Sequence, residues 1–162
     1  METLFRGYRE DIARVIHEAF IAMNKDRIDQ NDPRVLPWDD LPDIYRESNR
    51  RQAEWFPTYL ETVGCGFAPA KDAPPRRVKF THEEVELLAQ MEHERWWSQK
   101  QAAGYVFGPK RSDAEGTHPS ILPWEELSGE EREKDRQAVQ EIPARFADAG
   151  FETYRLTNKG SL

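Results

Sequence analysis

Two segments of the chain repeat each other, and this duplication limits the fold more than any other feature of the sequence. Residues 32–41 read DPRVLPWDDL and residues 118–127 read HPSILPWEEL, an offset of 86 positions. The identical pairs are Pro33/Pro119, Leu36/Leu122, Pro37/Pro123, Trp38/Trp124 and Leu41/Leu127. Upstream, His17-Glu18 matches His93-Glu94 at an offset of 76 positions. Ordered matches of this kind indicate an internal duplication, so each copy is expected to form the same supersecondary structure.

Each copy is expected to form a helix, a loop and a second helix. In the first copy, apolar residues recur at helical spacing up to Met23, and a turn-rich stretch follows at 29–42. A second helix is expected over roughly 43–63. Pro57 lies inside it and predicts a kink or break near Phe56, because proline lacks a backbone donor and crowds the preceding turn.

Capping motifs mark the helices of the second copy. The segments 81–84 (THEE) and 128–131 (SGEE) have the form of capping boxes, so helices are expected to begin after Thr81 and Ser128. These helices are expected to end near Ala103 and Gly150. Alternating residue character predicts short strands over 77–80 and 151–156.

Together these patterns predict a mainly α fold, built from tandem helical-hairpin repeats with four main helices in a pseudo-twofold arrangement and a few short β-strands. The expected division is a degenerate first repeat at 1–67, a Pro-rich linker and short strand at 68–80, and a full second repeat at 81–162. One helical hairpin buries too little surface to be stable alone, so the two repeats are expected to share one compact unit.

Composition narrows the classes of function. The formal net charge of -7 disfavours duplex nucleic acid as a partner, because a negative field repels phosphate backbones. Cys65 is the only cysteine, and the chain has neither a long apolar run nor a secretory leader, so we expect a cytoplasmic protein that does not span a membrane. It carries no phosphate-binding glycine loop, no nucleophile elbow and no metal-ligand spacing, so we expect a binding protein without cofactor or metal, and not an enzyme.

The second copy resembles the RyR repeat, the module named for the ryanodine receptor calcium channels. The resemblance rests on residues 93–96 (HERW), 104–108 (GYVFG), 118–124 (HPSILPW) and 134–136 (KDR), and it covers about 81–151. Residues 12–67 look like a degenerate copy that keeps His-Glu and Pro-Trp but lacks the Gly-Tyr-x-Phe-Gly strand.

The resemblance implies a helical tandem repeat of the bacterial or phage type. Such modules are cytosolic and regulatory in the receptors, and family knowledge suggests that they bind adenine-type nucleotides. Prokaryotic versions accompany nucleotide-signal immune systems. The expected function is therefore recognition of a small nucleotide-like ligand, as a sensor or as a sponge that sequesters a signal.

A comparison of the two copies suggests where the ligand would bind. Helix positions Ile16, Ala19, Phe20 and Met23 of the first copy, expected to be buried, correspond to Glu92, Arg95, Trp96 and Gln99 of the second. A loop with aromatic and basic residues follows in the second copy. The predicted ligand-binding residues are Trp96, Tyr105 and Trp124 for stacking, Arg95, Arg111 and Arg136 for anion contacts, and Glu92 and His118 for sugar or base groups.

Structural interpretations of the same residues stay open at this point. Glu92 and Arg95 can form a local ion pair at the edge of the core, and Asp135 can pair with Arg136. Tyr105 and Phe107 can belong to a structural flap. The two Pro-Trp tryptophans can be packing anchors, and His17 and His93 can hydrogen-bond between helices.

The alternative function is a protein-interaction or oligomerisation module without a small ligand. The polar face of the second copy would then be a partner surface or the interface of a homodimer.

Overall fold

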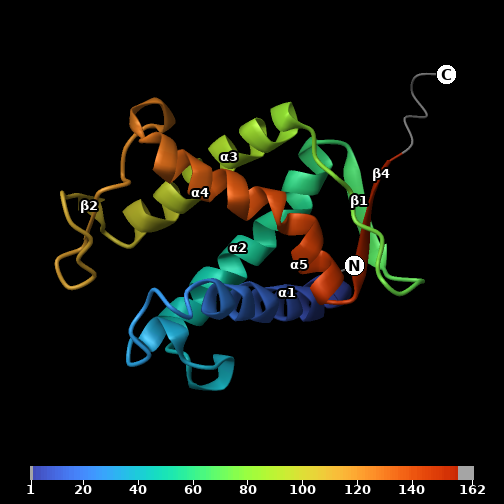
Figure 1. Cartoon of the computed structure of the whole chain (residues 1–162), viewed down its shortest axis with the longest axis horizontal. Helices are drawn as coiled ribbons and strands as arrows, with labels where there is room; N and C mark the ends of the chain where they lie inside the picture. Colours follow the sequence, from blue (N-terminus) through green and yellow to red (C-terminus); the bar gives the residue numbers. More distant parts are fainter. Residues whose placement is uncertain (1, 157–162) are drawn as a thin grey trace. The chain divides into compact units, whose positions relative to one another are not determined.

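The computed structural model describes residues 2–156, with side chains from residue 7 onward. Most of this part of the chain is helical (Figure 1). The helices are α1 (Glu2–Met23), α2 (Asp43–Thr62), α3 (His82–Ala102), α4 (Gly129–Gln140) and α5 (Ile142–Asp148). The strands are β1 (Cys65–Pro69), β2 (Val106–Phe107), β3 (Thr117–His118) and β4 (Phe151–Arg155). The expected mainly helical fold with a few short strands is confirmed, and the expected fourth main helix is divided into α4 and α5.

The contacts divide the chain into two compact units. The first unit contains the residues up to Val78 together with the segment from Ile142 onward, and the second unit contains Lys79–Glu141. The repeat boundaries drawn from the sequence stay a prediction.

In the first unit, α1 packs against α2, and β1 pairs with β4 in an antiparallel two-stranded sheet. Aromatic rings fill its core: Tyr8 stacks on Phe67 with centroids 4.6 Å apart, and Phe67 lies 4.9 Å from Phe146. Non-local strand pairing and aromatic packing therefore join the start and the end of the described chain.

In the second unit, α3 packs against α4, and the two helices lie side by side in Figure 1. The loop after α3 contains β2 and β3, which form a short parallel pair in which Phe107 lies opposite His118. This unit holds all residues of the site described below.

Local capping determines where two helices begin, as expected. The Thr81 hydroxyl accepts from the Glu84 backbone N–H, and the Glu84 carboxylate accepts from the Thr81 N–H, which forms the complete capping box of α3. At the start of α4 the Ser128 hydroxyl accepts from the Glu131 N–H, but the Glu131 carboxylate accepts from Ser120 and Lys134, so only half of the expected capping box forms there. Each bond satisfies a backbone donor that the first helical turn leaves unpaired.

Three local expectations were wrong. α2 continues as a helix through Pro57, so the expected break is wrong and the alternative of a kink stays a prediction. The buried Phe56, Tyr59 and Leu60 on either side of Pro57 supply packing that offsets the lost hydrogen bond. Residues 77–80 form no strand, although Val78 donates its N–H to the Thr153 hydroxyl. Ile16, Ala19 and Phe20 are half-buried and Met23 is 53% exposed, so none of these four residues belongs to the fully buried face of α1.

Several contacts recur at the sequence offsets of the repeat. The His17 Nε2–H donates to the Leu36 carbonyl (2.6 Å), and the His93 Nε2–H donates to the Leu122 carbonyl (2.7 Å). Both histidines are 2% exposed. Each histidine therefore bonds a loop carbonyl of its own copy, and the expected hydrogen bond between two helices is wrong.

The tryptophans of the two Pro-Trp pairs also have matching neighbours. Arg50 lies over Trp38 and forms an ion pair with Glu10, and Arg136 lies over Trp124 and forms an ion pair with Glu86. These paired contacts are those expected of two related copies. The tandem, pseudo-twofold relation itself stays a prediction.

No helix within residues 2–156 is both long and apolar enough to cross a membrane.

Candidate functional site

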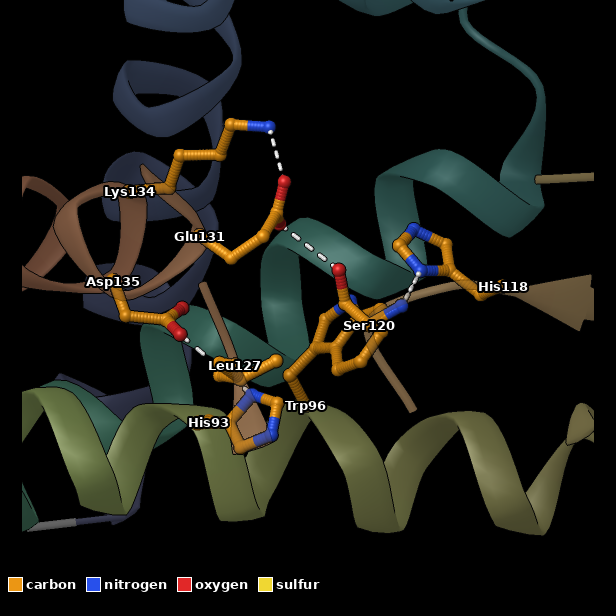
Figure 2. A pocket seen from close by; sticks show the side chains of 8 residues that line it. All are labelled: His93, Trp96, His118, Ser120, Leu127, Glu131, Lys134 and Asp135. Carbon is orange, nitrogen blue, oxygen red and sulfur yellow. Dashed lines mark hydrogen bonds and ion pairs between the residues drawn. The ribbon is translucent and has the colours of Figure 1, made fainter. Parts of the chain in front are cut away.

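The second unit contains a cavity of about 210 Å³ between α3, α4 and the segment that leads from β3 into α4. Figure 2 shows its lining side chains directed into the same space. These residues are His93, Trp96, His118, Ser120, Leu127, Glu131, Lys134 and Asp135.

Helical spacing explains how two elements supply most of the polar lining. His93 and Trp96 are three positions apart on α3 and therefore share a face. Glu131, Lys134 and Asp135 occupy positions three and four apart on α4. The Ser128 cap starts α4 at Gly129, and this start puts Glu131 in the first turn with its side chain toward Ser120.

His93 has a defined tautomer because a carbonyl oxygen can only accept. Its Nε2 must carry the hydrogen that bonds the Leu122 carbonyl, so Nδ1 of the neutral ring has a lone pair. That Nδ1 lies 3.6 Å from Asp135 Oδ2, a distance of an ion-pair contact and too long for a good hydrogen bond. A carboxyl and a ring nitrogen therefore face each other at one end of the cavity.

The Asp135 carboxyl lies in a setting that disfavours its ionised form. Burial, reinforced by the negative charges of Glu92 and Glu131, raises the pKa of Asp135 to about 7. Its side chain is 23% exposed. The neutral form of the Asp135 carboxyl is thus stabilised over a pH range in which an ordinary aspartate is ionised.

A hydrogen-bonded chain crosses from the loop to the rim of the cavity. The Ser120 hydroxyl donates to Glu131 Oε2 (2.9 Å), and Lys134 Nζ donates to Glu131 Oε1 (3.0 Å). Burial acts to raise the pKa of the Glu131 carboxyl, but the hydrogen bonds from Lys134 and Ser120 outweigh it and lower that pKa below its ordinary value. Glu131 is therefore a carboxylate, and Lys134, whose side chain is 66% exposed, is the cation at the rim.

His118 lies opposite the Asp135 end of the cavity and is neutral. The Ser120 backbone N–H donates to its Nδ1 (3.0 Å), so Nε2 carries the ring proton. Burial lowers the pKa of His118, and the positive charges of Arg111 and Lys100 lower it further. The His118 ring meets the Trp96 ring edge to face, with centroids 4.7 Å apart.

Trp96 and His118 are the residues of the predicted site that line this cavity. Glu92 and Arg95 do not line it. They form a buried two-pronged ion pair (2.6 and 3.2 Å), and Arg95 also donates to Gln99 (2.7 Å). The structural interpretation of Glu92 and Arg95 as a local ion pair is confirmed.

Tyr105 and Arg111 meet in the loop, outside this cavity. Both donate to Asp113, the Tyr105 hydroxyl at 2.9 Å and the Arg111 guanidinium at 3.4 Å. Lys100 Nζ lies 4.4 Å from the centre of the Tyr105 ring. Phe107, expected to pack in the structural flap, is 52% exposed.

Trp124 and Arg136 lie together but also do not line the cavity. The guanidinium of Arg132 lies 5.6 Å from the Trp124 ring centre, and that of Arg136 lies 5.8 Å away. Arg136 pairs with Glu86 and Glu133, so the expected Asp135–Arg136 pair is wrong. Neighbours in sequence point to different sides of a helix.

Sequence reasoning missed most of the polar lining, yet the repeat carried a signal for it. At the offset of 86 positions, Glu131, Lys134 and Asp135 correspond to Tyr45, Ser48 and Asn49. Three uncharged residues of one copy are thus charged in the other, at positions that share a helix face.

The family model described as the RyR domain matches residues 78–153. The match covers the whole of the second unit, Lys79–Glu141, and it continues through α5 into β4. A search of the curated proteins finds no match. Within the described residues, no three His, Cys, Asp or Glu side chains are grouped so that they could hold a metal ion.

Proposed function

From the premise that this chain carries an RyR domain at residues 78–153, we propose that it is a non-catalytic binding protein that takes a small nucleotide-like ligand into the cavity of the second unit. The supporting observation is the cavity itself, which combines an aromatic wall at Trp96, hydrogen-bonding groups at Ser120 and Asp135, and a cation at the rim. A protein of this kind serves as a sensor or a sponge for a nucleotide signal.

The aromatic wall supports recognition of a base. Trp96 offers a large flat ring, and stacking of a base on an aromatic side chain contributes about 1–3 kcal/mol. Leu127 adds apolar surface to the lining. A ring inserted beside Trp96 would therefore gain both stacking and burial.

The size of the cavity indicates which part of the ligand enters. At about 210 Å³ it is smaller than the roughly 300–1,000 Å³ pockets that hold whole drug-sized molecules. A base or nucleoside fits this smaller space, and a phosphate would stay outside, within reach of Lys134. The arginines first expected to hold phosphate are already paired with Glu92, Asp113 and Glu86.

A thermal-shift panel of mononucleotides and cyclic nucleotides with different bases tests the proposal. A ligand present at 100 times its dissociation constant stabilises the protein by about 2.7 kcal/mol, which raises the Tm by roughly 5–10 °C for a chain of this length. The absence of a shift with every nucleotide at millimolar concentration would overturn the proposal. Mass analysis of the ligand after incubation must return it intact, because hydrolysis would contradict a non-catalytic role.

Matched variants locate the binding. Trp96→Leu should weaken binding by the loss of stacking, whereas Trp55→Leu, at a 42% exposed tryptophan of the first unit, should leave it unchanged. Lys134→Met removes the exposed cation at the rim without changing the core. It should weaken the binding of nucleotides more than the binding of the corresponding nucleosides. Equal effects of the two tryptophan variants would place the ligand elsewhere.

A second candidate function rests on a different observation. Val106 is 59% and Phe107 52% exposed on the short strand β2, so this strand presents apolar surface to solvent. Such a surface suits a protein partner or a second copy of the chain. Light scattering over a concentration series tests self-association, which Phe107→Ser should abolish.

A further inference from the structure

We propose that Asp135, supported by His93, is the residue that selects the ligand, and that it binds an edge bearing two adjacent N–H donors, as guanine presents. This inference rests on the proposed function, because it names the chemistry of the ligand in the same cavity.

The hydrogen-bonding groups at the Asp135 end of the cavity determine which ligand edge can bind there. The Leu122 carbonyl fixes the His93 hydrogen on Nε2, so Nδ1 faces Asp135 Oδ2 at 3.6 Å with its lone pair. The remaining oxygen lone pairs of Asp135 are acceptors, and they complement donors on the ligand.

The opposite end of the cavity has the reverse character. His118 accepts the Ser120 N–H at Nδ1 and therefore carries its hydrogen on Nε2. Acceptors at the Asp135 end and this N–H donor at the His118 end give the cavity a direction, while Lys134 provides an ammonium on the α4 side of the rim, beside Glu131 (Figure 2). A ligand bound in this direction turns its N–H edge to Asp135 and an acceptor atom on its far side to His118.

The charges around Asp135 favour the same kind of ligand. Glu92 of α3 and Glu131 of α4 are negative, Arg95 and Lys134 are positive and already paired with them, and His93 lies directly opposite. N–H donors stabilise the carboxylate that these surroundings otherwise disfavour. Since burial and the neighbouring carboxylates raise the pKa of Asp135 to about 7, binding of a donor edge should release protons and tighten as the pH rises from 6 to 7.5.

Titration calorimetry with guanosine, inosine and adenosine tests the inference. Nucleosides avoid the phosphate group, which itself titrates near pH 6. Guanosine presents two N–H donors on one edge, inosine presents one, and adenosine presents a donor beside an acceptor. Guanosine should bind about 5- to 150-fold more tightly than adenosine, with inosine between them.

Asp135→Asn should remove most of this preference, because an amide offers one acceptor and one donor group. It should also abolish the proton release, measured by repeating the titration in buffers of different ionisation enthalpy. Glu130→Gln, at an exposed position of the same helix, should leave the preference for guanosine and the proton release unchanged. The melting temperature of each variant shows that it is folded.

The outcomes separate the two proposals. Adenosine binding as tightly as guanosine, or an Asp135→Asn variant that keeps the preference and the proton release, would overturn the assignment of Asp135 and leave nucleotide binding standing. No binding by any nucleoside, together with no thermal shift by any nucleotide, would overturn the proposed function and this inference with it.

Discussion

Replacing Asp135 with asparagine should remove a pH-dependent loss of stability from the second unit. Burial and the neighbouring carboxylates raise the pKa of Asp135 from 3.8 to about 7 in the folded protein. Between these values the folded state holds a proton that the unfolded state has lost, so stability falls as the pH rises through this window and levels off above about 7. The full difference corresponds to about 4 kcal/mol, since each pKa unit is worth about 1.4 kcal/mol.

The stability that the Asp135→Asn variant gains is expected to be smaller than this limit of about 4 kcal/mol. The Asp135 side chain is 23% exposed toward the cavity, so water reaches the ionised carboxylate in part. We therefore expect Asp135→Asn to gain about 2–4 kcal/mol of stability relative to the native chain between pH 4 and pH 8. Asparagine retains the shape of the side chain and cannot ionise, and Asn49 occupies the corresponding position in the first copy.

Urea unfolding at a series of pH values measures this difference. Tryptophan fluorescence is a suitable probe, because Trp96, Trp97 and Trp124 all lie in the second unit. Asp11→Asn, at an exposed position on α1, is the matched control and should follow the native chain within about 0.5 kcal/mol. The reasoning would be refuted if the difference in unfolding free energy between the native chain and the Asp135→Asn variant stayed constant from pH 4 to pH 8, or if it changed in favour of the native chain.

Two further predictions concern the buried Glu92–Arg95 ion pair and the Thr81 cap of α3. Glu92→Gln should destabilise the protein by about 3 kcal/mol, because it leaves the Arg95 guanidinium buried with its charge uncompensated. Glu94→Gln, exposed on the same helix, should cost less than about 0.5 kcal/mol in the same urea titration, and equal costs would contradict the role of the pair. Thr81→Ala should cost about 1 kcal/mol through loss of the α3 cap, whereas His82→Ala should cost much less, and thermal unfolding of both variants checks the difference.

The parts of the fold that depend on neighbouring residues could be predicted from the sequence. The Thr81 and Ser128 caps are local, because each side chain bonds a backbone N–H three residues ahead, and both helix starts were found. Pro57 failed as a helix breaker for the opposite reason. Its effect is decided by tertiary packing of the buried residues on either side, which no local pattern reports.

Strand β1 was missed for a related reason. Its residues, Cys65–Pro69, contain two stop or turn residues and no alternation, and their strand character comes from pairing with β4 far along the chain. The β4 segment alternates in sequence and was predicted. Non-local pairing of this kind is visible from a sequence only when both partners carry the pattern.

The candidate site was predicted in part. The first helices of the two copies pointed to Trp96, and the aromatic and basic loop pointed to His118, both of which line the cavity. The three predicted arginines do not line this cavity, and each has a carboxylate partner, Glu92, Asp113 or Glu86, that the sequence does not reveal. Their role in binding a ligand stays a prediction. Ion pairs between residues 50 positions apart, as in Arg136 and Glu86, depend on the packing of α4 on α3.

The binding of a ligand in the second-unit cavity is tested most directly by nuclear magnetic resonance of the isotope-labelled full chain during titration with GMP. We predict that the backbone signals of His118 and Ser120 and the indole N–H signal of Trp96, assigned through Trp96→Phe, shift together and saturably. Saturable shifts confined to α1 and α2, or a spectrum unchanged by GMP and by the other nucleotides at millimolar concentration, would contradict the account.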